Sequence, residues 1–376
     1  MARRSAMENM EISNQFNNIY AGKKVLLTGH TGFKGAWLAL WLEQLGAEII
    51  GYALDPPTSP NLFTLLNIKL TDYRHNLLEK ETLKSVVEKH QPDIVFHLAA
   101  QPLVRTSYTE PEDTFLSNAI GTMNLLEACR TLNKKVSIVC ITTDKVYHNN
   151  EWVYGYREVD ALGGYDPYSA SKACAEIIIN SYRKSFFNPE KDGVVQLASA
   201  RAGNVIGGGD WAAYRIVPDF IQALAGNQKL IIRSPRSVRP WQHVLEPLSG
   251  YLYLGMKLLQ GEKQCCDAWN FGPDDENIVD VKTLVEKALT FWPGGSYEIQ
   301  EDKNAPHEAG LLKLDCSKAK HVLKWFPVLD FTQTMALTVD WYRDYNSNSS
   351  DIRSRTLADL NVYTNTAKNR QANWIS

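Results

Sequence analysis

The feature that most constrains the fold of this chain is a glycine-rich loop between an expected strand and an expected helix. Residues 24–28 have the short apolar composition of a buried strand, and residues 29–35 follow with three glycines. Apolar residues 36–42 then predict a helix that ends near Gly46, and residues 48–54 predict a second strand. This order is typical of a dinucleotide-binding fold, because glycines let the backbone approach a pyrophosphate at a helix N-terminus.

The loop and the end of the second strand supply the first candidate cofactor-binding residues. Asp55 follows the second strand, where a carboxylate can bind both hydroxyls of a ribose and repel a 2′-phosphate. The sequence therefore favours NAD over NADP, although a lysine inside the loop is a contrary indication. The alternatives are a glycine-rich turn without a ligand and a simple turn at Asp55 before two prolines. The candidates in the loop are Gly29, Gly32, Phe33, Lys34 and Gly35.

A second group of residues carries acid–base chemistry. Thr142-Thr143-Asp144-Lys145 ends an expected strand over residues 136–142, and an expected helix places Tyr168 and Lys172 one turn apart on one face. An ammonium beside a phenol lowers the pKa of the phenol and makes it a usable base. This is more equipment than simple hydride transfer needs, so it indicates oxidation coupled to elimination. Taken alone, the Tyr-x-x-x-Lys spacing is weak, since a surface aromatic stacked on a lysine stem has the same spacing.

The rest of the chain continues the alternation of strands and helices. Further strands are expected at residues 93–100, 136–142 and 193–200, with helices at 111–132 and 168–184. Such alternation predicts an α/β fold with a doubly wound parallel Rossmann sheet and a smaller C-terminal substrate-binding lobe. The expected divisions are a flexible N-terminal extension (1–21), an NAD-binding Rossmann domain (22–200), a mainly substrate-binding lobe with segments returning to the sheet (201–346) and a peripheral polar C-terminal tail (347–376).

Composition limits the classes of partner. The formal net charge is −2, which gives no electrostatic case for a nucleic-acid or membrane partner. No apolar run approaches the length of a transmembrane helix. The 6 cysteines are scattered without a Cys-x-x-Cys pair, which is typical of reduced thiols in the cytoplasm. The 8 histidines show no metal-ligand spacing, so no metal is expected.

Together these motifs resemble the extended short-chain dehydrogenase/reductase family, through the loop after Thr28, the segment 97–101 and the Tyr168/Lys172 pair. Within it, the chain is similar to the nucleotide-sugar 4,6-dehydratases over roughly residues 22 to 346. Asp144-Lys145 is the pattern of the branch that acts on CDP-glucose, where the dTDP-glucose branch carries Asp-Glu and the 4-epimerases lack such a pair. Residues 308–315 lack the arginine of the dTDP-glucose branch, which also favours the branch that acts on CDP-glucose. The specific matches are residues 29–41, 51–58, 99–105, 142–147, 201–211 and 239–244.

The resemblance also implies binding residues. Besides the loop and Asp55, it assigns to NAD the residues Asn76, Leu98, Ala99, Ala100, Gln101, Thr142, Tyr168 and Lys172. Asn76 stands where relatives often have Asp against the adenine, which puts the affinity for the cofactor in question. For the substrate, the candidates are Gln101, Arg105, Asn204, Arg215, Arg239 and His243, and His243 is equally well a core histidine. Arginine forks suit the diphosphate because they bind phosphate oxygens in pairs.

The implied reaction converts CDP-glucose to CDP-4-keto-6-deoxyglucose and water, as a step of deoxysugar biosynthesis for lipopolysaccharide O-antigen. Tyr168, supported by Lys172, takes the proton of the 4-hydroxyl, and Thr143 hydrogen-bonds the 4-oxygen. Asp144 protonates the departing 6-hydroxyl, and Lys145 stands at the position of the base for C5. These roles need a neutral Lys145 and a protonated Asp144, whereas an ion pair would silence both. The alternative role for Lys145 is to bind the cofactor or the diphosphate.

Other classes of function stay open. They are a 4-epimerase, a dehydratase for another nucleotide, and a non-catalytic NAD-binding scaffold, against which the intact Thr143, Tyr168 and Lys172 argue. The resemblance further implies a homodimer or a dimer of dimers, formed through the helix 111–132 and the helix that carries Tyr168. The latter shows more apolar surface than one buried stripe requires, at Cys174, Ile177, Ile178, Ile179 and Tyr182.

Overall fold

The computed structural model describes residues 15–191, 194–300, 310–348 and 351–375, and these ranges contain a seven-stranded sheet of order β11-β6-β5-β4-β1-β2-β3. All neighbouring pairs of these strands are parallel. Because the order reverses between β1 and β4, ligands are expected at the carboxyl ends of these strands. The predicted doubly wound sheet is confirmed. The strands are β1 (Lys24–Thr28), β2 (Glu48–Ala53), β3 (Thr71–Arg74), β4 (Ile94–His97), β5 (Val136–Ile141), β6 (Val195–Arg201) and β11 (Ala268–Asn270).

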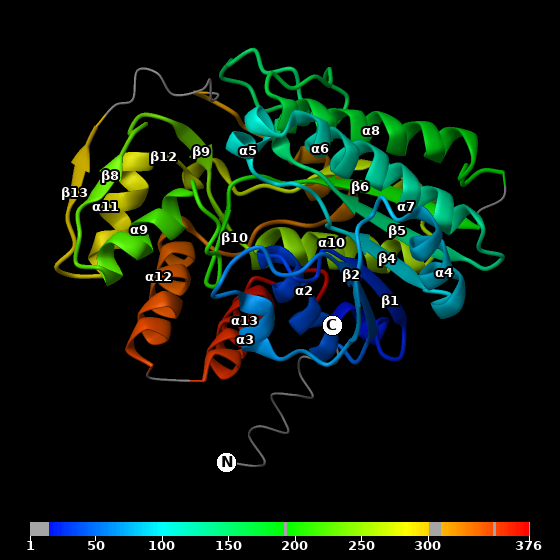
Figure 1. Cartoon of the computed structure of the whole chain (residues 1–376), viewed down its shortest axis with the longest axis horizontal. Helices are drawn as coiled ribbons and strands as arrows, with labels where there is room; N and C mark the ends of the chain where they lie inside the picture. Colours follow the sequence, from blue (N-terminus) through cyan, green and yellow to red (C-terminus); the bar gives the residue numbers. More distant parts are fainter. Residues whose placement is uncertain (1–14, 192–193, 301–309, 349–350, 376) are drawn as a thin grey trace.

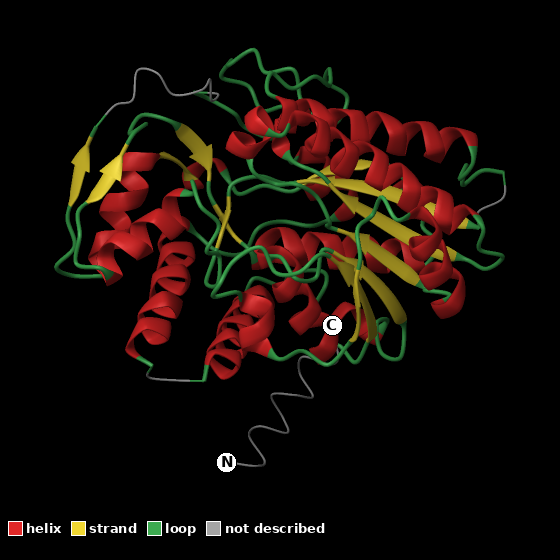
Figure 2. Cartoon of the chain, viewed as in Figure 1, coloured by secondary structure: helices red, strands yellow, loops and turns green. Residues whose placement is uncertain are grey.

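Helices cover both faces of the sheet (Figures 1 and 2). Successive strand residues point to opposite faces, so Leu27 packs in one apolar layer and Leu26 in the other. One layer contains α2 (Phe33–Gln44), α10 (Leu245–Leu259) and α13 (Ile352–Asn369), and the opposite layer contains α4 (Lys80–His90), α7 (Gly121–Arg130) and α8 (Pro167–Ser185). The sheet therefore separates two apolar layers, and its carboxyl edge stays open for a site.

The chain beyond β6 builds a second lobe and then returns to the sheet through α10 and β11. Figure 1 shows this lobe beside the carboxyl ends of the strands. Its helices are α9 (Ile216–Ala225), α11 (Val281–Phe291) and α12 (Phe331–Ser347). Its strand pairs are β7 (Val205–Ile206) with β10 (Gln242–His243), β8 (Leu230–Ile232) with β13 (Tyr297–Ile299), and β9 (Val238–Pro240) with β12 (Ile278–Asp280).

Short helices line the route from β4 to α7. They are α5 (Val104–Thr109) and α6 (Pro111–Phe115), and a π-helical turn η2 (Leu116–Ile120) joins α6 to α7, whereas the short helix α3 (Leu62–Leu66) lies between β2 and β3. The expected helix over residues 111–132 is thus present as one helical run with a π turn, a feature that is frequent at functional sites. Residue 193, expected at the start of the strand 193–200, lies outside the described residues.

Both ends of the chain correct the sequence-based expectations. Residues 1–14 of the expected extension lie outside the described residues, as do 349, 350 and 376 of the expected tail. Phe16, however, is fully buried, and its ring stacks on Trp374 with centroids 5.2 Å apart. Tyr363 of α13 is also fully buried. Burying large aromatic rings is strongly favourable, so a few of them anchor a segment whose overall composition is polar.

Glu246 at the start of α10 joins three segments from inside the core. The N–H groups of Val328 and Leu329 donate to its Oε1 at 2.9 and 2.6 Å, and the hydroxyl of Tyr363 donates to its Oε2 at 2.9 Å. Burial raises the pKa of Glu246 to about 7, against the opposing effect of these hydrogen bonds. The folded protein therefore binds this proton more strongly than the unfolded chain does.

This carboxyl group predicts a pH-dependent stability. Its contribution is fully present below the ordinary glutamate pKa of about 4.3 and is lost as the pH rises through about 7, a change of roughly 4 kcal/mol. Glu246→Gln resembles the protonated acid, so the stability of the variant relative to the wild type should increase between about pH 5 and about pH 8. Urea unfolding at both pH values measures this difference, and a constant difference would contradict the prediction. Because the comparison is between two chains that share every other group, it isolates Glu246.

Candidate active site

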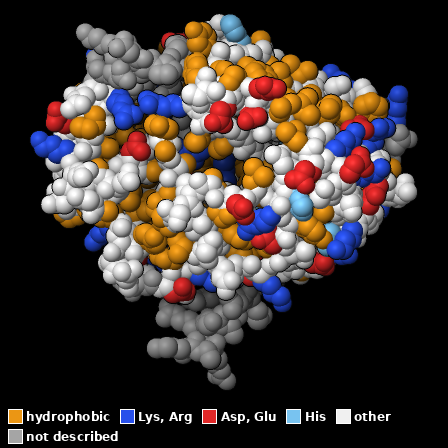
Figure 3. Space-filling view, viewed as in Figure 1, with side chains coloured by type: hydrophobic (Ala, Val, Ile, Leu, Met, Phe, Trp, Pro, Cys, Tyr) orange, Lys and Arg blue, Asp and Glu red, His pale blue; other side chains and the backbone are white. Residues whose placement is uncertain are grey.

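The carboxyl ends of β1, β4 and β5 meet the start of α8 at one edge of the sheet. β5 ends at Ile141, so residues 142–145 leave the sheet there and enter the short turn η3 (Asp144–Val146). α8 begins at Pro167, and the side chain of Asp166 caps it by accepting from the N–H of Ser169 at 3.0 Å. This cap places Tyr168 in the first turn, facing the end of β5. Figure 3 shows a hollow near the middle of this face, with basic side chains inside it and apolar side chains around it.

Tyr168 and Lys172 are both buried at this edge. The Nζ of Lys172 donates to the carbonyl oxygen of Ile141 at 3.3 Å. Burial raises the pKa of Tyr168 to about 12, and a hydrogen bond with Thr143 opposes this effect. Burial likewise lowers the pKa of Lys172 to about 8. In the protein chain itself, desolvation of the phenolate outweighs the effects that lower the Tyr168 pKa. The lowering of this pKa by the Lys172 ammonium stays a prediction.

Asp144 and Lys145 are in contact, and their exposure differs. Asp144 is fully buried; its Oδ1 accepts from the hydroxyl of Thr143 and its Oδ2 from the Nδ2 of Asn204, each at 2.9 Å. The Nζ of Lys145 lies 3.7 Å from Asp144 Oδ1, and its side chain is 19% exposed. A Cβ at Gly203 would lie 2.0 Å from this carboxylate, so the backbone approaches it closely. The structure therefore brings Thr143, Asp144 and Lys145 together as expected, and both an ion pair and a neutral pair fit the contact.

The glycine-rich loop fits a dinucleotide pyrophosphate. Gly29 has φ +76°, and a Cβ there would lie 2.7 Å from the backbone N of Ala99. A Cβ at Gly35 would lie 2.0 Å from the carbonyl oxygen of Gly29, so the loop is too tight for a side chain at either position. Gly32 is the N-cap of α2 and offers no side-chain cap, which leaves the first N–H groups of the helix for an anion.

The expected adenosine contacts lie at the ends of β2 and β3. The carboxylate of Asp55 is 90% exposed and lies 3.7 Å from Nη1 of Arg74. Arg74 itself packs over the ring of Phe63, 5.0 Å from its centroid, a neighbour that the sequence did not indicate. Asn76 uses its Oδ1 to accept from the N–H of Leu78 at 2.9 Å, so its side chain stabilises the turn after β3. Leu98–Gln101 directly follow β4, beside the loop.

Lys34 points away from this ribose position and toward the catalytic residues. Its Nζ lies over the ring of Tyr251 in α10, 5.9 Å from the centroid. Burial lowers the pKa of Lys34 to about 7, and the positive charges of Arg215 and Lys172 lower it further while Asp144 opposes them. The Lys34 charge interacts with these catalytic and substrate-binding candidates. Lys34 therefore gives no reason to expect a cofactor with a 2′-phosphate.

Arg215 and Arg105 are the candidate substrate residues at the mouth of the second lobe. Arg215 donates to Asp210 Oδ2 at 2.8 Å and keeps 34% of its side chain exposed. The guanidinium of Arg105 in α5 lies over the ring of Tyr214, 5.0 Å from its centroid. Tyr214 has φ +64°, a backbone conformation that is uncommon outside glycine. This contact links the two lobes across the mouth of the site.

The remaining substrate candidates lie deeper. His243 is fully buried, its ring packs edge-on against Trp37 at 5.9 Å, and burial lowers its pKa to about 3, which makes it a core histidine. Asn204 holds Asp144, as described above, and in this structure its amide is directed at the carboxylate. Gln101 donates to the carbonyl oxygen of Leu103 at 3.1 Å and to the hydroxyl of Thr114 at 2.8 Å, so it organises its own loop.

Arg239 belongs to strand β9, and its side chain is buried beside Gly310. It donates to the carbonyl oxygens of Val238 at 3.0 Å and Gly310 at 3.2 Å. Of the discriminating segment 308–315, residues 308 and 309 lie outside the described residues. A diphosphate contact by Arg239 therefore stays a prediction.

Sequence reasoning missed two residues that support the site. Asn118 in η2 donates to the hydroxyl of Ser171 at 2.8 Å and accepts from the N–H of Gln101 at 2.8 Å, so it fixes α8 beside Lys172. Asparagine inside a helix is unfavourable, which is a signal that the sequence contained. Glu176, four residues after Lys172 on the same face of α8, is the other; a carboxylate in an apolar stretch of that helix could have indicated it.

The chain is similar to known proteins over most of its length. A family model described as GDP-mannose 4,6 dehydratase matches residues 26–338. The chain belongs to this family. A CDP-glucose 4,6-dehydratase of Salmonella typhimurium is 49% identical over 331 residues, which cover 87% of this chain and 92% of that protein. The resemblance to the nucleotide-sugar dehydratases is thereby confirmed.

Solved structures share the fold of this dehydratase-family protein. A dTDP-glucose 4,6-dehydratase of Bacillus anthracis in complex with NAD has a TM-score of 0.72 at 22% identity, over 87% of this chain and 98% of that one. A dTDP-glucose 4,6-dehydratase of Streptomyces venezuelae with NAD bound has a TM-score of 0.73 at 20% identity, over 86% and 98%. At this level of identity, the comparison supports the Rossmann-type architecture.

Within the described ranges, no helix of the dehydratase-family chain combines the length and the apolar character that crossing a membrane requires. The same ranges contain no group of three or more His, Cys, Asp or Glu side chains that could hold a metal ion.

Proposed function

We propose that this protein converts CDP-glucose to CDP-4-keto-6-deoxyglucose and water, with NAD as its bound cofactor. The observation that carries the proposal is the 49% identity to the Salmonella typhimurium CDP-glucose 4,6-dehydratase over nearly the whole chain. Asp144 and Lys145 beside Tyr168 and Lys172 support it, because this set can perform both oxidation and elimination. The glycine-rich loop, and the NAD in two solved structures of the same fold, support the cofactor.

Oxidation at C4 depends on Tyr168. When bound, NAD accepts the hydride from C4 of the sugar and later returns it to C6. Tyr168 removes the proton of the 4-hydroxyl, so its pKa must fall from about 12 on ligand binding. Thr143, which hydrogen-bonds the phenol, and the Lys172 ammonium are the groups of this chain that can stabilise the phenolate.

Elimination of water uses the buried pair. Asp144 protonates the departing 6-hydroxyl, and Lys145 takes the proton from C5 and gives it back to C5 when the hydride returns to C6. The two side chains lie 3.7 Å apart, which suits groups that act on neighbouring carbons of one sugar. Thr143 and Asn204 hold the Asp144 carboxyl group in place through their hydrogen bonds. The lobe of residues 201–346, with Arg215 at its mouth, binds the nucleotide diphosphate.

One assay tests the function against its alternatives. The purified protein is incubated with NAD and CDP-glucose, and with dTDP-glucose or GDP-mannose in parallel, and the 4-ketosugar is followed by its absorbance in alkali. The expected result is turnover of CDP-glucose with no net formation of NADH. Preference for another nucleotide would indicate a different dehydratase, and a 4-epimer without ketone would indicate an epimerase. Consumption of none of these sugars would support the non-catalytic scaffold.

The assembly is proposed as a homodimer, alone or paired into a dimer of dimers, in the cytoplasm. Ile177 of α8 is 58% exposed and Phe115 of α6 is 36% exposed, whereas Ile179 is buried and Ile178 packs against the core. Ile177→Glu should therefore shift the protein from dimer to monomer without disturbing the fold, because a charge at an apolar interface is costly. Light scattering at micromolar concentration measures the mass. A monomeric wild type, or a dimer unaffected by Ile177→Glu, would contradict this interface.

The six cysteines are all described and free, which supports the proposed location in the cytoplasm, a reducing compartment.

A further inference from the structure

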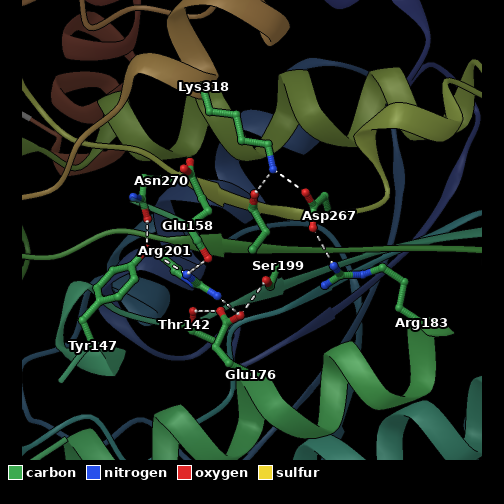
Figure 4. A network of polar contacts seen from close by, with 11 residues as sticks. Thr142, Tyr147, Glu158, Glu176, Arg183, Ser199, Arg201, Asp267, Asn270 and Lys318 are labelled. Carbon is green, nitrogen blue, oxygen red and sulfur yellow. Dashed lines mark hydrogen bonds and ion pairs between the residues drawn. The ribbon is translucent and has the colours of Figure 1, made fainter. Parts of the chain in front are cut away.

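A buried polar network, drawn in Figure 4, includes Glu176, which follows Lys172 by one helical turn, and Thr142, which directly precedes Thr143. Its centre is the ion pair between Glu176 of α8 and Arg201 of β6, 2.7 Å apart, with side chains 2% and 4% exposed. The hydroxyl of Thr142 donates to Glu176 Oε1 at 2.5 Å, and that of Ser199 donates to Oε2 at 2.9 Å. The pair therefore joins the catalytic helix to the carboxyl ends of β5 and β6.

The same pair holds the chain on the far side of the catalytic turn. Arg201 Nη1 donates to the hydroxyl of Tyr147 at 2.7 Å, and the guanidinium lies over the Tyr147 ring, 5.0 Å from its centroid. Tyr147 in turn donates to Asn270 Oδ1 at 2.7 Å, which ties it to β11. Thr142 precedes the segment Thr143-Asp144-Lys145 and Tyr147 follows it shortly after. Both flanks of this segment are thus bonded to one ion pair.

Stability alone does not account for such a pair. Desolvating two charges is expensive, and well-packed apolar residues of similar volume are often as stable or more stable. Its position is specific, however, because Glu176 lies one turn from Lys172 and two turns from Tyr168 on one face of α8. Reaction rates depend on the exact positions of catalytic groups, since a displacement of such a group by about 1 Å lowers the rate on the order of 10²-fold.

We propose that Glu176 and Arg201 are positioning residues, which hold Thr142 and Tyr147 and thereby fix the Thr143-Asp144-Lys145 segment opposite Tyr168 and Lys172. The reaction in which they act rests on the proposed function. The positioning itself follows from the contacts and can be measured without substrate.

The charge of Glu176 adds a second effect, on Lys172. Burial lowers the pKa of Lys172 to about 8, and Cys140 and Glu176 raise it against that effect. Lys172 also interacts with His97 of β4 and Lys34 of α2, and Tyr168 lies one turn before it on the same face of α8. Loss of the Glu176 carboxylate should lower the pKa of Lys172 further. The alkaline side of the pH–rate profile should then move to lower pH.

Glu176→Gln tests the proposal, because it keeps the shape of the side chain and removes its charge. Asp359→Asn is the matched control: it replaces the buried carboxylate of the Arg355–Asp359 ion pair, 2.9 Å apart in α13 and outside the site. We expect Glu176→Gln to lower the single-turnover rate of C4 oxidation, followed at 340 nm, by about 10²-fold. In this variant KM should change little, and the alkaline side of the pH–rate profile should move to lower pH. Asp359→Asn should keep the wild-type rate and profile, whatever its thermal midpoint.

Hydrogen exchange supplies a readout that needs no substrate. Backbone amides of residues 142–147 should exchange faster in Glu176→Gln than in the wild type or in Asp359→Asn. Wild-type rate, pH profile and exchange in Glu176→Gln would overturn the proposal. If this variant does not fold, Arg201→Lys replaces it, since lysine keeps the charge and loses the fork; slower oxidation with faster exchange supports the proposal, and wild-type values overturn it. A wild type that does not oxidise CDP-glucose would overturn the proposed function, while the exchange comparison would still decide the positioning role.

Discussion

Tyr168→Phe is expected to lower kcat for CDP-glucose by about 10²–10⁴-fold, the usual effect of removing a positioned acid–base group. The ring of phenylalanine fits the cavity of the buried tyrosine, so the fold should be preserved. The lost hydroxyl is the group that takes the proton from the 4-hydroxyl, and Thr143 can no longer orient it. The alkaline absorbance of the ketosugar measures turnover, and the thermal midpoint measures folding.

A matched control separates chemistry from folding in this experiment. Tyr20→Phe also removes a buried phenol hydroxyl, which donates to the carbonyl oxygen of Leu252 in the core. This variant should lose stability and keep its turnover. Near-normal turnover of Tyr168→Phe with an unchanged thermal midpoint would show that Tyr168 is not the base.

Asp144→Asn should separate oxidation from elimination. The amide cannot protonate the departing 6-hydroxyl, whereas the groups for C4 oxidation, Tyr168 and Lys172, are untouched. After mixing with CDP-glucose, absorbance at 340 nm should therefore rise and persist, and formation of the final product should fall by about 10²–10⁴-fold. Stopped-flow absorbance and product analysis measure the two steps.

A second variant controls for the loss of a buried carboxylate as such. Asp359→Asn makes an identical change at another buried carboxyl group and should leave the 340 nm trace at its wild-type course. If Asp144→Asn binds the substrate but produces no absorbance at 340 nm, the division of labour between Tyr168 and Asp144 is wrong.

The local elements of this fold could be predicted from the sequence because they depend on short-range sterics and periodicity. The tight loop needs glycine at position 35 because a Cβ there would lie 2.0 Å from the carbonyl oxygen of Gly29 in the same loop. Tyr168 and Lys172 share a face because helical spacing puts them there, and the strand β5 delivers Thr143 to the sheet edge because parallel strands end together. These patterns identified the α/β class and the residues that meet at the site.

The tertiary structure decided what depends on contacts between distant residues. Burial sets the direction of the Tyr168 pKa, and the sequence pattern contains no measure of that desolvation. His243 proved to be a core residue because Trp37, from another element, covers it. The chain end that looks polar is anchored because Trp374 meets Phe16 across the whole sequence. Glu176 and Arg201 likewise become a pair through the pairing of β5 with β6 and the packing of α8, which is long-range information that local composition does not carry.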